Sequence, residues 1–204
     1  MSLVTRTPDA TARERLLDAA DQLMWQRGFE AAGVAELCTL ADAPRGSFYY
    51  WWPSKQALAL AMIERAWERL RAALFEPAFG REMTFTDQLD EYVTLLTAHL
   101  ERAKRSTACV AGCRFGNLAA ELSTRDEEVR TAIEAVFVDM ERIFASALAK
   151  AVASGELDDH LDPADAAEAL CAHMEGLMIL AKARNEPQIL HRLRTDGRRL
   201  VGAS

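Results

Sequence analysis

Apolar residues recur every three or four positions along almost the whole chain, which places them on one face of a helix. The first such run follows Thr11-x-x-Glu14, a capping box that predicts a helix start. Gly28 is expected to end this helix in a left-handed conformation. The sequence has no alternating run of β-branched residues long enough for a strand. The pattern therefore predicts an all-α protein with about nine helices.

Two short helices and a long one are expected next. The apolar residues of the segment 34–41 share one face, and a second short helix is expected over Arg45–Trp51. Asp42-Ala43-Pro44 separates the two as a tight break. Ser54 is a candidate N-cap for a long helix that ends near Phe75, before Pro77. The predicted order is long helix, short helix, turn, short helix, long helix.

Helical periodicity resumes after a loop at 76–83. Further helices are expected to begin at Thr86, Thr124, Pro163 and Pro187. Thr124-x-x-Glu127 resembles a capping box, and its helix should continue to Gly155. Asp162-Pro163 provides an N-cap with proline at the first helical position. The helix that it opens, over 163–184, carries an apolar stripe of Ala167, Leu170, Met174, Leu177 and Met178. A final helix is expected over 187–200, and the stretch 106–117, with two glycines, is less regular.

Composition narrows the class of protein. Half of the 204 residues are hydrophobic and 27% are charged, as in ordinary globular domains. The net charge is −7, yet residues 1–55 hold six Lys or Arg against seven Asp or Glu, so charge neither favours nor excludes DNA. No apolar run approaches a membrane span and no leader is visible, which predicts a cytoplasmic protein without a membrane partner. Four irregularly spaced cysteines predict neither a disulfide framework nor a zinc site.

Five consecutive aromatic residues, from Phe48 to Trp52, make up a third of all the rings in the chain. At about 100° per residue, Phe48 and Trp52 fall close together on the helix and should pack on the preceding short helix, against Leu37 and Cys38. The other residues should point outward, where they can contact phosphate oxygens and base edges. The expected DNA contacts are Arg45, Gly46, Ser47, Tyr49, Tyr50, Trp51 and Lys55. The alternative is a helical hairpin whose rings are all core.

These residues resemble the DNA-binding domain of the TetR family of bacterial regulators over residues 11–65. The matching strings are Arg45-Gly46-Ser47-Phe48-Tyr49 and Pro53-Ser54-Lys55, with Gly28-Phe29 also in register. The chain departs from the family pattern in five places: Gly33, Ala35, Asp42, Pro44 and Trp51-Trp52. Gly33 and Ala35 replace common phosphate contacts, and Asp42 must adopt a turn conformation that glycine usually takes.

The resemblance implies a function as well as a fold. Residues 1–53 would form the three-helix DNA-binding domain, and residues 54–204 a helical domain that binds a ligand and dimerises. The helices at 163–184 and 187–200 would build the homodimer bundle. A small-molecule inducer would release the repressor from a pseudo-palindromic, double-stranded DNA operator. The apolar stripe of the 163–184 helix fits this dimer face, and it fits an intrachain core equally. A rival interpretation is a helical small-molecule-binding protein with little or no DNA binding.

The string Gly112-Cys113-Arg114-Phe115-Gly116-Asn117, which Cys109 precedes, is similar to one found in a TetR subgroup that includes regulators responding to reactive electrophiles. On this hypothesis Cys113 is a low-pKa thiol, activated by Arg114 or by a helix N-terminus. The alternative is that Cys113 is a small buried hydrophobic residue.

Other polar and aromatic side chains could bind a ligand in the second domain. Together with Cys113, the candidates are Tyr92, His99, Asn117, Phe137 and His173. The alternative for most of them is plain core or dimer face. Cys171-x-His173 is too small a set to predict a metal, and no nucleophile elbow, phosphate loop or dinucleotide fingerprint occurs. We therefore expect no enzyme, no catalytic residues and no cofactor.

Overall fold

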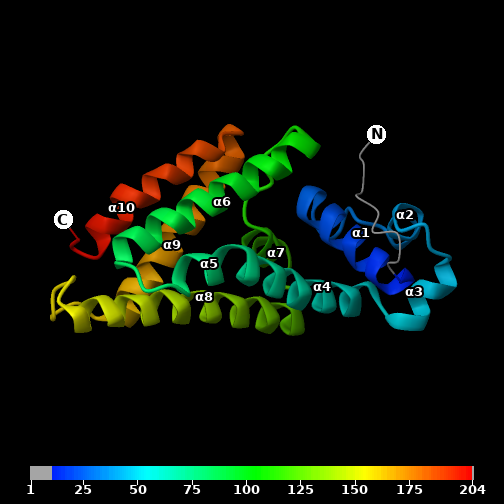
Figure 1. The fold of residues 1–204 in the computed structure, drawn as a ribbon. Coiled ribbons are helices and arrows are strands. Elements are labelled where there is room, and N and C mark those ends of the chain that lie inside the picture. Colours follow the sequence, from blue (N-terminus) through cyan, green and yellow to red (C-terminus); the bar gives the residue numbers. More distant parts are fainter. Residues whose placement is uncertain (1–10, 204) are drawn as a thin grey trace. The chain divides into compact units, whose positions relative to one another are not determined.

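The computed structural model describes residues 11–203, and within that range the chain is helical without a strand (Figure 1). A π turn joins α4 to α5, so the ten α-helical segments α1–α10 of the described residues form nine separate helices. The all-α prediction is confirmed. The chain divides into two compact units: the described residues up to Glu68 with Arg114–Glu134, and Arg69–Cys113 with the described residues from Ala135 onward. The functional division expected at residue 53 stays a prediction.

The first unit contains the helices α1 (Ala12–Arg27), α2 (Val34–Leu40), α3 (Arg45–Trp51), most of α4 (Lys55–Leu70) and α7 (Arg114–Leu122). The capping box at the start of α1 is present: the backbone N–H of Thr11 donates to Glu14 at 2.7 Å, and the Thr11 hydroxyl accepts from the Glu14 N–H. Gly28 ends α1 with a φ of +88°. Asp42 takes the turn conformation expected of it, with a φ of +49°.

The long helix does not end near Phe75 as predicted. After α4 the backbone continues through the π turn Arg71–Phe75 and the short α5 (Glu76–Phe79), and stops at Gly80. Proline in a helix interior removes a hydrogen bond and clashes with the carbonyl four residues earlier. Here Pro77 lies in the first turn of α5, directly after the wider π turn. The local change in winding lets the helical path pass the proline.

The second unit contains α6 (Phe85–Thr107), most of α8 (Glu127–Ser154), α9 (Pro163–Arg184), a 3-10 turn η2 (Pro187–His191) and α10 (Arg192–Leu200). Two predicted starts are wrong. Thr84, not Thr86, caps α6, because its hydroxyl accepts from the Asp87 N–H at 3.1 Å. α8 begins at Glu127 rather than at Thr124, because the Asp126 carboxylate accepts from the Val129 N–H at 3.0 Å. The predicted 187–200 helix is a 3-10 turn followed by α10.

The apolar stripe of α9 lies in the interior of its own chain. Its five residues are at most 6% exposed: Ala167, Leu170, Met174, Leu177 and Met178. These side chains therefore form intrachain core, and a dimer would have to use another face of α9. The opposite face carries Ala172, Gly176, Ile179 and Ala183, all exposed, at intervals of four, three and four residues. Ile179 is 66% exposed, which is unusual for a large aliphatic side chain.

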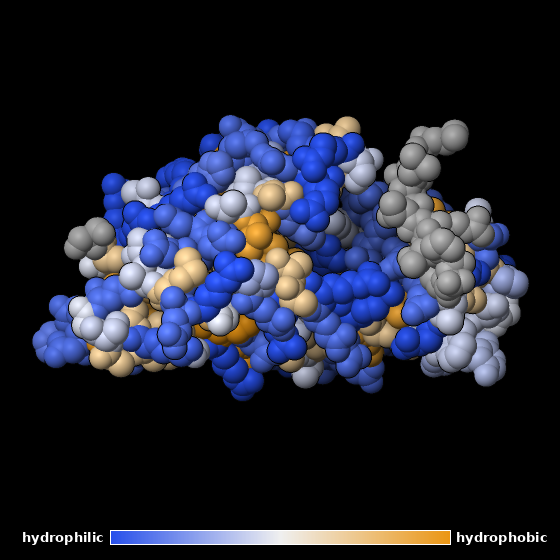
Figure 2. Space-filling view, viewed as in Figure 1, coloured by the Kyte–Doolittle hydropathy of each residue, from blue (hydrophilic) through white to orange (hydrophobic). Residues whose placement is uncertain are grey.

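The surface in Figure 2 is mainly hydrophilic, with small separate hydrophobic patches. Within the described part of the chain, no helix is long and apolar enough to cross a membrane.

Candidate functional site

Helix α3 divides its rings between two directions. Phe48 is fully buried and Trp52 is 5% exposed, and their ring centroids lie 6.2 Å apart. Tyr49, Tyr50 and Trp51 are 58%, 78% and 45% exposed. The predicted division into an inward pair and an outward trio is therefore confirmed. Three large aromatic rings side by side on the surface are unusual for a monomer, because exposed apolar area in water is unfavourable. Such a patch is typical of an interaction surface.

The buried side of α3 packs in the first unit, where α2 and α1 both contact it. Leu37 is fully buried and Cys38 is 5% exposed. Burial raises the pKa of the Cys38 thiol, which keeps it protonated and unreactive. The turn before α3 is held by Arg15, whose guanidinium donates to the carbonyls of Ala41 at 2.8 Å and Asp42 at 3.1 Å. These bonds fix the angle at which α3 leaves α2.

The polar residues expected at DNA lie at the two ends of α3. Arg45 is exposed at its first position, and Ser47 is half-buried in the first turn. A Cβ built at Gly46 would meet no heavy atom within 4 Å, so the protein's own packing does not require glycine there. Lys55 begins α4, and its ammonium lies 4.1 Å from the centroid of the Phe29 ring. It also donates weakly to the Glu30 carbonyl at 3.4 Å, so the lysine already has a structural contact.

Helix α7 holds the end of α1 and the turn after it. The Glu121 carboxylate accepts from the backbone N–H groups of Phe29 and Glu30, both at 2.8 Å. Gly28 lies so close beneath it that an added Cβ would be 2.7 Å from Oε2 of Glu121. The role of Glu121 was not predicted, because a glutamate on the face of an amphipathic helix gives no signal of a partner 92 residues away.

Arg114 occupies the first position of α7 and contacts α1. Its guanidinium forms an ion pair with Asp21 and lies 4.3 Å from the centroid of the Trp25 ring. The arginine that was expected to activate Cys113 is therefore engaged by a carboxylate and an indole. Of the two activating groups considered, the N-terminus of α7 remains, since Cys113 directly precedes it.

The ligand candidates are only partly brought together in the second unit. Tyr92 is 1% exposed, and its hydroxyl donates to the Met174 sulfur at 2.9 Å. Burial raises the Tyr92 pKa well above its usual value, and the nearby Glu175 and the thiols of Cys113 and Cys171 add to the shift. Tyr92 and Cys113 thus share one electrostatic environment. Asn117 lies on α7 in the first unit.

Cys113 is half-buried and hydrogen-bonds to the Glu175 carboxyl. Burial raises the pKa of Glu175, and the bond to Cys113 opposes that shift. One oxygen of the Glu175 carboxyl, Oε1, is buried and has no hydrogen-bond partner among the described residues. Glu175 was not predicted from sequence: it lies beside the buried α9 stripe and has no motif around it.

The remaining ligand-binding candidates are half-buried and lie on three different helices. His99 lies on α6 and Phe137 on α8, both partly exposed to solvent. Nε2 of His173 on α9 lies 3.3 Å from a carboxylate oxygen of Asp196 on α10. Nε2 has no hydrogen-bond partner among the described residues, so this contact between α9 and α10 is one of proximity only.

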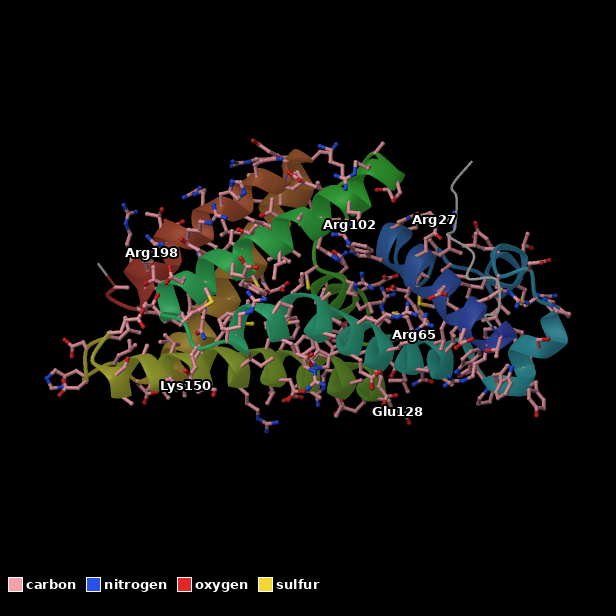
Figure 3. The ribbon with its side chains drawn as sticks, viewed as in Figure 1. Arg27, Arg65, Arg102, Glu128, Lys150 and Arg198 are labelled. Atoms are coloured by element: carbon pink, nitrogen blue, oxygen red, sulfur yellow. The ribbon has the colours of Figure 1, made fainter. Side chains whose placement is uncertain are left out.

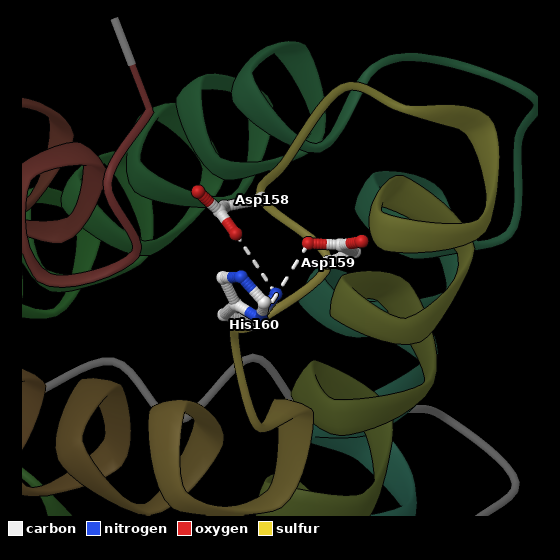
Figure 4. A group of neighbouring side chains, drawn as sticks. All are labelled: Asp158, Asp159 and His160. Carbon is white, nitrogen blue, oxygen red and sulfur yellow. Dashed lines mark hydrogen bonds and ion pairs between the residues drawn. The ribbon is translucent and has the colours of Figure 1, made fainter.

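Cys171, which the sequence paired with His173 as a weak metal candidate, is buried on α9. Burial, followed by Glu175 and Glu141, raises the pKa of Cys171 to about 12, so the thiol is protonated. Asp158, Asp159 and His160 do gather on an exposed loop after α8 (Figure 4). The Asp158 carboxylate accepts from the His160 backbone N–H at 2.8 Å, as is usual where aspartate stabilises a turn. Turn formation accounts for this group.

Comparison with known proteins places both parts of the chain. Residues 16–62 match the family described as "Bacterial regulatory proteins, tetR family". Residues 87–196 match "Tetracyclin repressor-like, C-terminal domain". The chain is 32% identical over 202 residues to the transcriptional regulator AcuR of Cereibacter sphaeroides, covering 95% of this chain and 88% of AcuR. It is 33% identical over 123 residues to the HTH-type transcriptional repressor NemR of Escherichia coli, which covers 60% of this chain and 59% of NemR.

Solved structures give the same result. A crystal structure of a regulatory protein TetR from Rhodobacter sphaeroides superposes with a TM-score of 0.81 at 30% identity, over 93% of this chain and 98% of that one. The reduced form of E. coli NemR superposes with a TM-score of 0.76 at 26% identity, over 95% of this chain and 98% of that one.

Proposed function

Because the chain belongs to the TetR family of bacterial transcriptional regulators, we propose that it represses transcription by inserting α3 of each subunit of a homodimer into the DNA major groove. The observation that carries this is the exposure of Tyr49, Tyr50 and Trp51 on a helix whose inner face is anchored by Phe48 and Trp52. A rigidly held helix with a free outer face can read base edges. Two such helices spaced about 34–36 Å apart match successive turns of a pseudo-palindromic operator.

The contacts divide between base edges and the phosphate backbone. Arg45 and the three outward rings lie on the exposed side of α3, whereas Lys55 begins the next helix, whose N-terminal N–H groups favour a phosphate. Gly46 leaves room for a close backbone approach, since nothing in the chain occupies the space beside it. Gly33, the N-cap of α2, has no side chain, so at this position only backbone N–H groups can bind a DNA phosphate.

The response to an inducer needs a ligand that binds the two spacings of α3 unequally. The interior group Tyr92, Cys113 and Glu175 is the proposed place for it, with a thiol-reactive electrophile as the ligand class. Cys113 directly precedes Arg114, whose ion pair with Asp21 holds α1. A covalent change at Cys113 would therefore act on the residue adjoining a contact to the DNA-binding helices. No cofactor or enzymatic turnover is part of the proposal, and a cytoplasmic location stays a prediction.

Operator binding tests the first part. The full-length protein is used to select DNA from a random pool, and the selected sequence is then measured by gel shift at several salt concentrations. Tyr49→Ala should weaken binding about tenfold, and Tyr49→Phe should show how much of the loss belongs to the hydroxyl. Absence of any salt-dependent specific binding by wild type would favour the rival interpretation, a ligand-binding protein without DNA function.

Thiol chemistry tests the second part. Wild type and Cys113→Ser are incubated with N-ethylmaleimide and then assayed for operator release. Cys109→Ser is the matched control, because Cys109 is the exposed cysteine of the same loop. Release that persists in Cys113→Ser and disappears in Cys109→Ser would move the sensor to Cys109.

A further inference from the structure

A trough runs over the second unit between the end of the α4–α5 helical path and α8. It consists of two adjoining hollows of about 270 Å³ and about 960 Å³. Both are lined by Phe79, Ala147 and Lys150, so they are continuous. Figure 3 labels Lys150 on α8. The larger hollow continues along the loop that precedes α6.

The smaller hollow is rich in positive charge, although the chain as a whole carries −7. Arg71, Arg142 and Lys150 line it, and Asp139 is the one carboxylate among its lining residues. Arg142 and Lys150 are eight residues apart on α8, about two turns, and therefore share a face. Arg71 reaches the same hollow from the π turn.

The two arginines form only weak ion pairs. Arg71 lies 3.7 Å from a Glu76 carboxylate oxygen, and Arg142 lies 3.3 Å from one of Asp139. The side chains of both arginines are more than half exposed. Exposed pairs of this kind contribute about 0–1 kcal/mol, so an incoming anion can compete for both guanidinium groups.

The floor of the hollow is apolar. Ile143 and Ala147 come from α8, and Phe79 is the last residue of α5. The Phe79 ring packs inward on Tyr92 and Phe144, with centroids 5.6 and 5.4 Å away. It is only half-buried, so it also contributes to the lining of the trough. Positive groups above an aromatic and aliphatic floor complement a molecule with one anionic group and a small apolar body.

We propose that the smaller hollow of this trough binds a small organic anion, a carboxylate or phosphate monoester attached to a ring or a short chain. Arg71 and Arg142 bind the charged group, for which the planar guanidinium is suited, and Lys150 adds a point charge. Phe79 and Ile143 pack against the apolar body. The inference goes beyond the proposed function, because it concerns binding that requires neither DNA nor the Cys113 thiol.

Isothermal titration of the full-length protein without DNA tests the site. The probes are benzoate, hexanoate and phenyl phosphate, with benzamide as the neutral match for benzoate and inorganic phosphate as the anion without an apolar body. At least one organic anion should bind, and benzoate should bind at least about threefold more tightly than benzamide. Arg142→Gln and Lys150→Gln should each weaken binding about threefold or more. Arg105→Gln, an exposed cation on α6 that does not line the trough, should leave binding unchanged.

Three results would overturn the proposal. The first is no binding of any of the three organic anions. The second is an equal loss in Arg105→Gln and Arg142→Gln, which would indicate a general charge effect. The third is equal affinity for inorganic phosphate and the organic anions, which would remove the role of Phe79 and Ile143. Operator binding by the same protein preparations separates any of these outcomes from failure of the proposed repressor function.

Discussion

Replacing Gly176 by leucine separates the stability of one chain from the stability of its dimer. Gly176 is exposed in the middle of α9, and a Cβ built on it meets no heavy atom within 4 Å. A glycine inside a helix costs about 0.8–1.0 kcal/mol relative to alanine. Within a single chain, Gly176→Leu should therefore raise the free energy of unfolding by about 0.5–1 kcal/mol, which corresponds to about 1–4 °C in Tm.

In the dimer the same change should have the opposite sign. Ala172, Gly176 and Ile179 form an exposed face on which small residues allow a second helix to approach closely. Bulk added to a packed contact costs about 1–3 kcal/mol per site. Two-fold symmetry repeats the substitution, so the dimer should lose about 2 kcal/mol or more. The dissociation constant should then rise at least about thirtyfold.

Sedimentation equilibrium over a range of concentrations measures this dissociation constant, and circular dichroism checks that helicity is unchanged. Ala149→Leu is the matched control, because Ala149 is an exposed small residue on α8. The control should dimerise as wild type does. If Gly176→Leu dimerises with the wild-type constant, this face of α9 is not the interface, and the reasoning from its exposed residues is refuted.

Three further changes have distinct expected outcomes. Tyr49→Ala should lower operator affinity in gel shifts, while the free energy of unfolding from urea titration stays within about 0.5 kcal/mol of wild type, because the side chain is 58% exposed. Gly28→Ala should destabilise the first unit by about 1–3 kcal/mol in a urea titration, because Gly28 has a φ of +88° and an added Cβ would be 2.7 Å from Glu121. Gly33→Ala is the control in the same titration, because a Cβ at Gly33 would meet no heavy atom within 4 Å. Glu175→Gln should raise stability at pH 7. Burial raises the pKa of Glu175 in the folded chain above its ordinary 4.5. The unfolded chain therefore loses this proton at a lower pH than the folded chain, and wild-type stability falls as the pH rises from 4.5 through the folded pKa. The difference between Glu175→Gln and wild type should therefore disappear below pH 4.5, and a difference that persists there would contradict this cause.

The sequence predicted those features that depend on residues within one helical turn of each other. The capping box of Thr11 and Glu14 and the Asp162 cap of α9 are both present, because a cap is made by groups two or three residues apart. The division of the α3 rings was predictable for the same reason, since a helix fixes side-chain directions at about 100° per residue.

Local rules failed where two local solutions compete or where packing changes the winding. Thr124 and Asp126 were both able to cap α8, and the structure uses Asp126, whose carboxylate also accepts from Gln56 at 2.9 Å. The stop before Pro77 was reasonable for a regular helix, and the π turn Arg71–Phe75 removed the need for it.

The sequence by itself determined the all-α class, the caps of α1 and α9 and the outward face of α3, and through the pattern around Arg45 and Lys55 it determined the family. Tertiary structure decided which distant residues interact. Glu121 accepts from the backbone N–H groups after Gly28, Arg114 forms an ion pair with Asp21, and Cys113 hydrogen-bonds to Glu175. It also turned the stripe of α9 inward and left Gly176 and Ile179 exposed to solvent. The physical reason is distance along the chain. Contacts within a turn follow from backbone geometry, whereas contacts between residues dozens of positions apart depend on how whole helices pack.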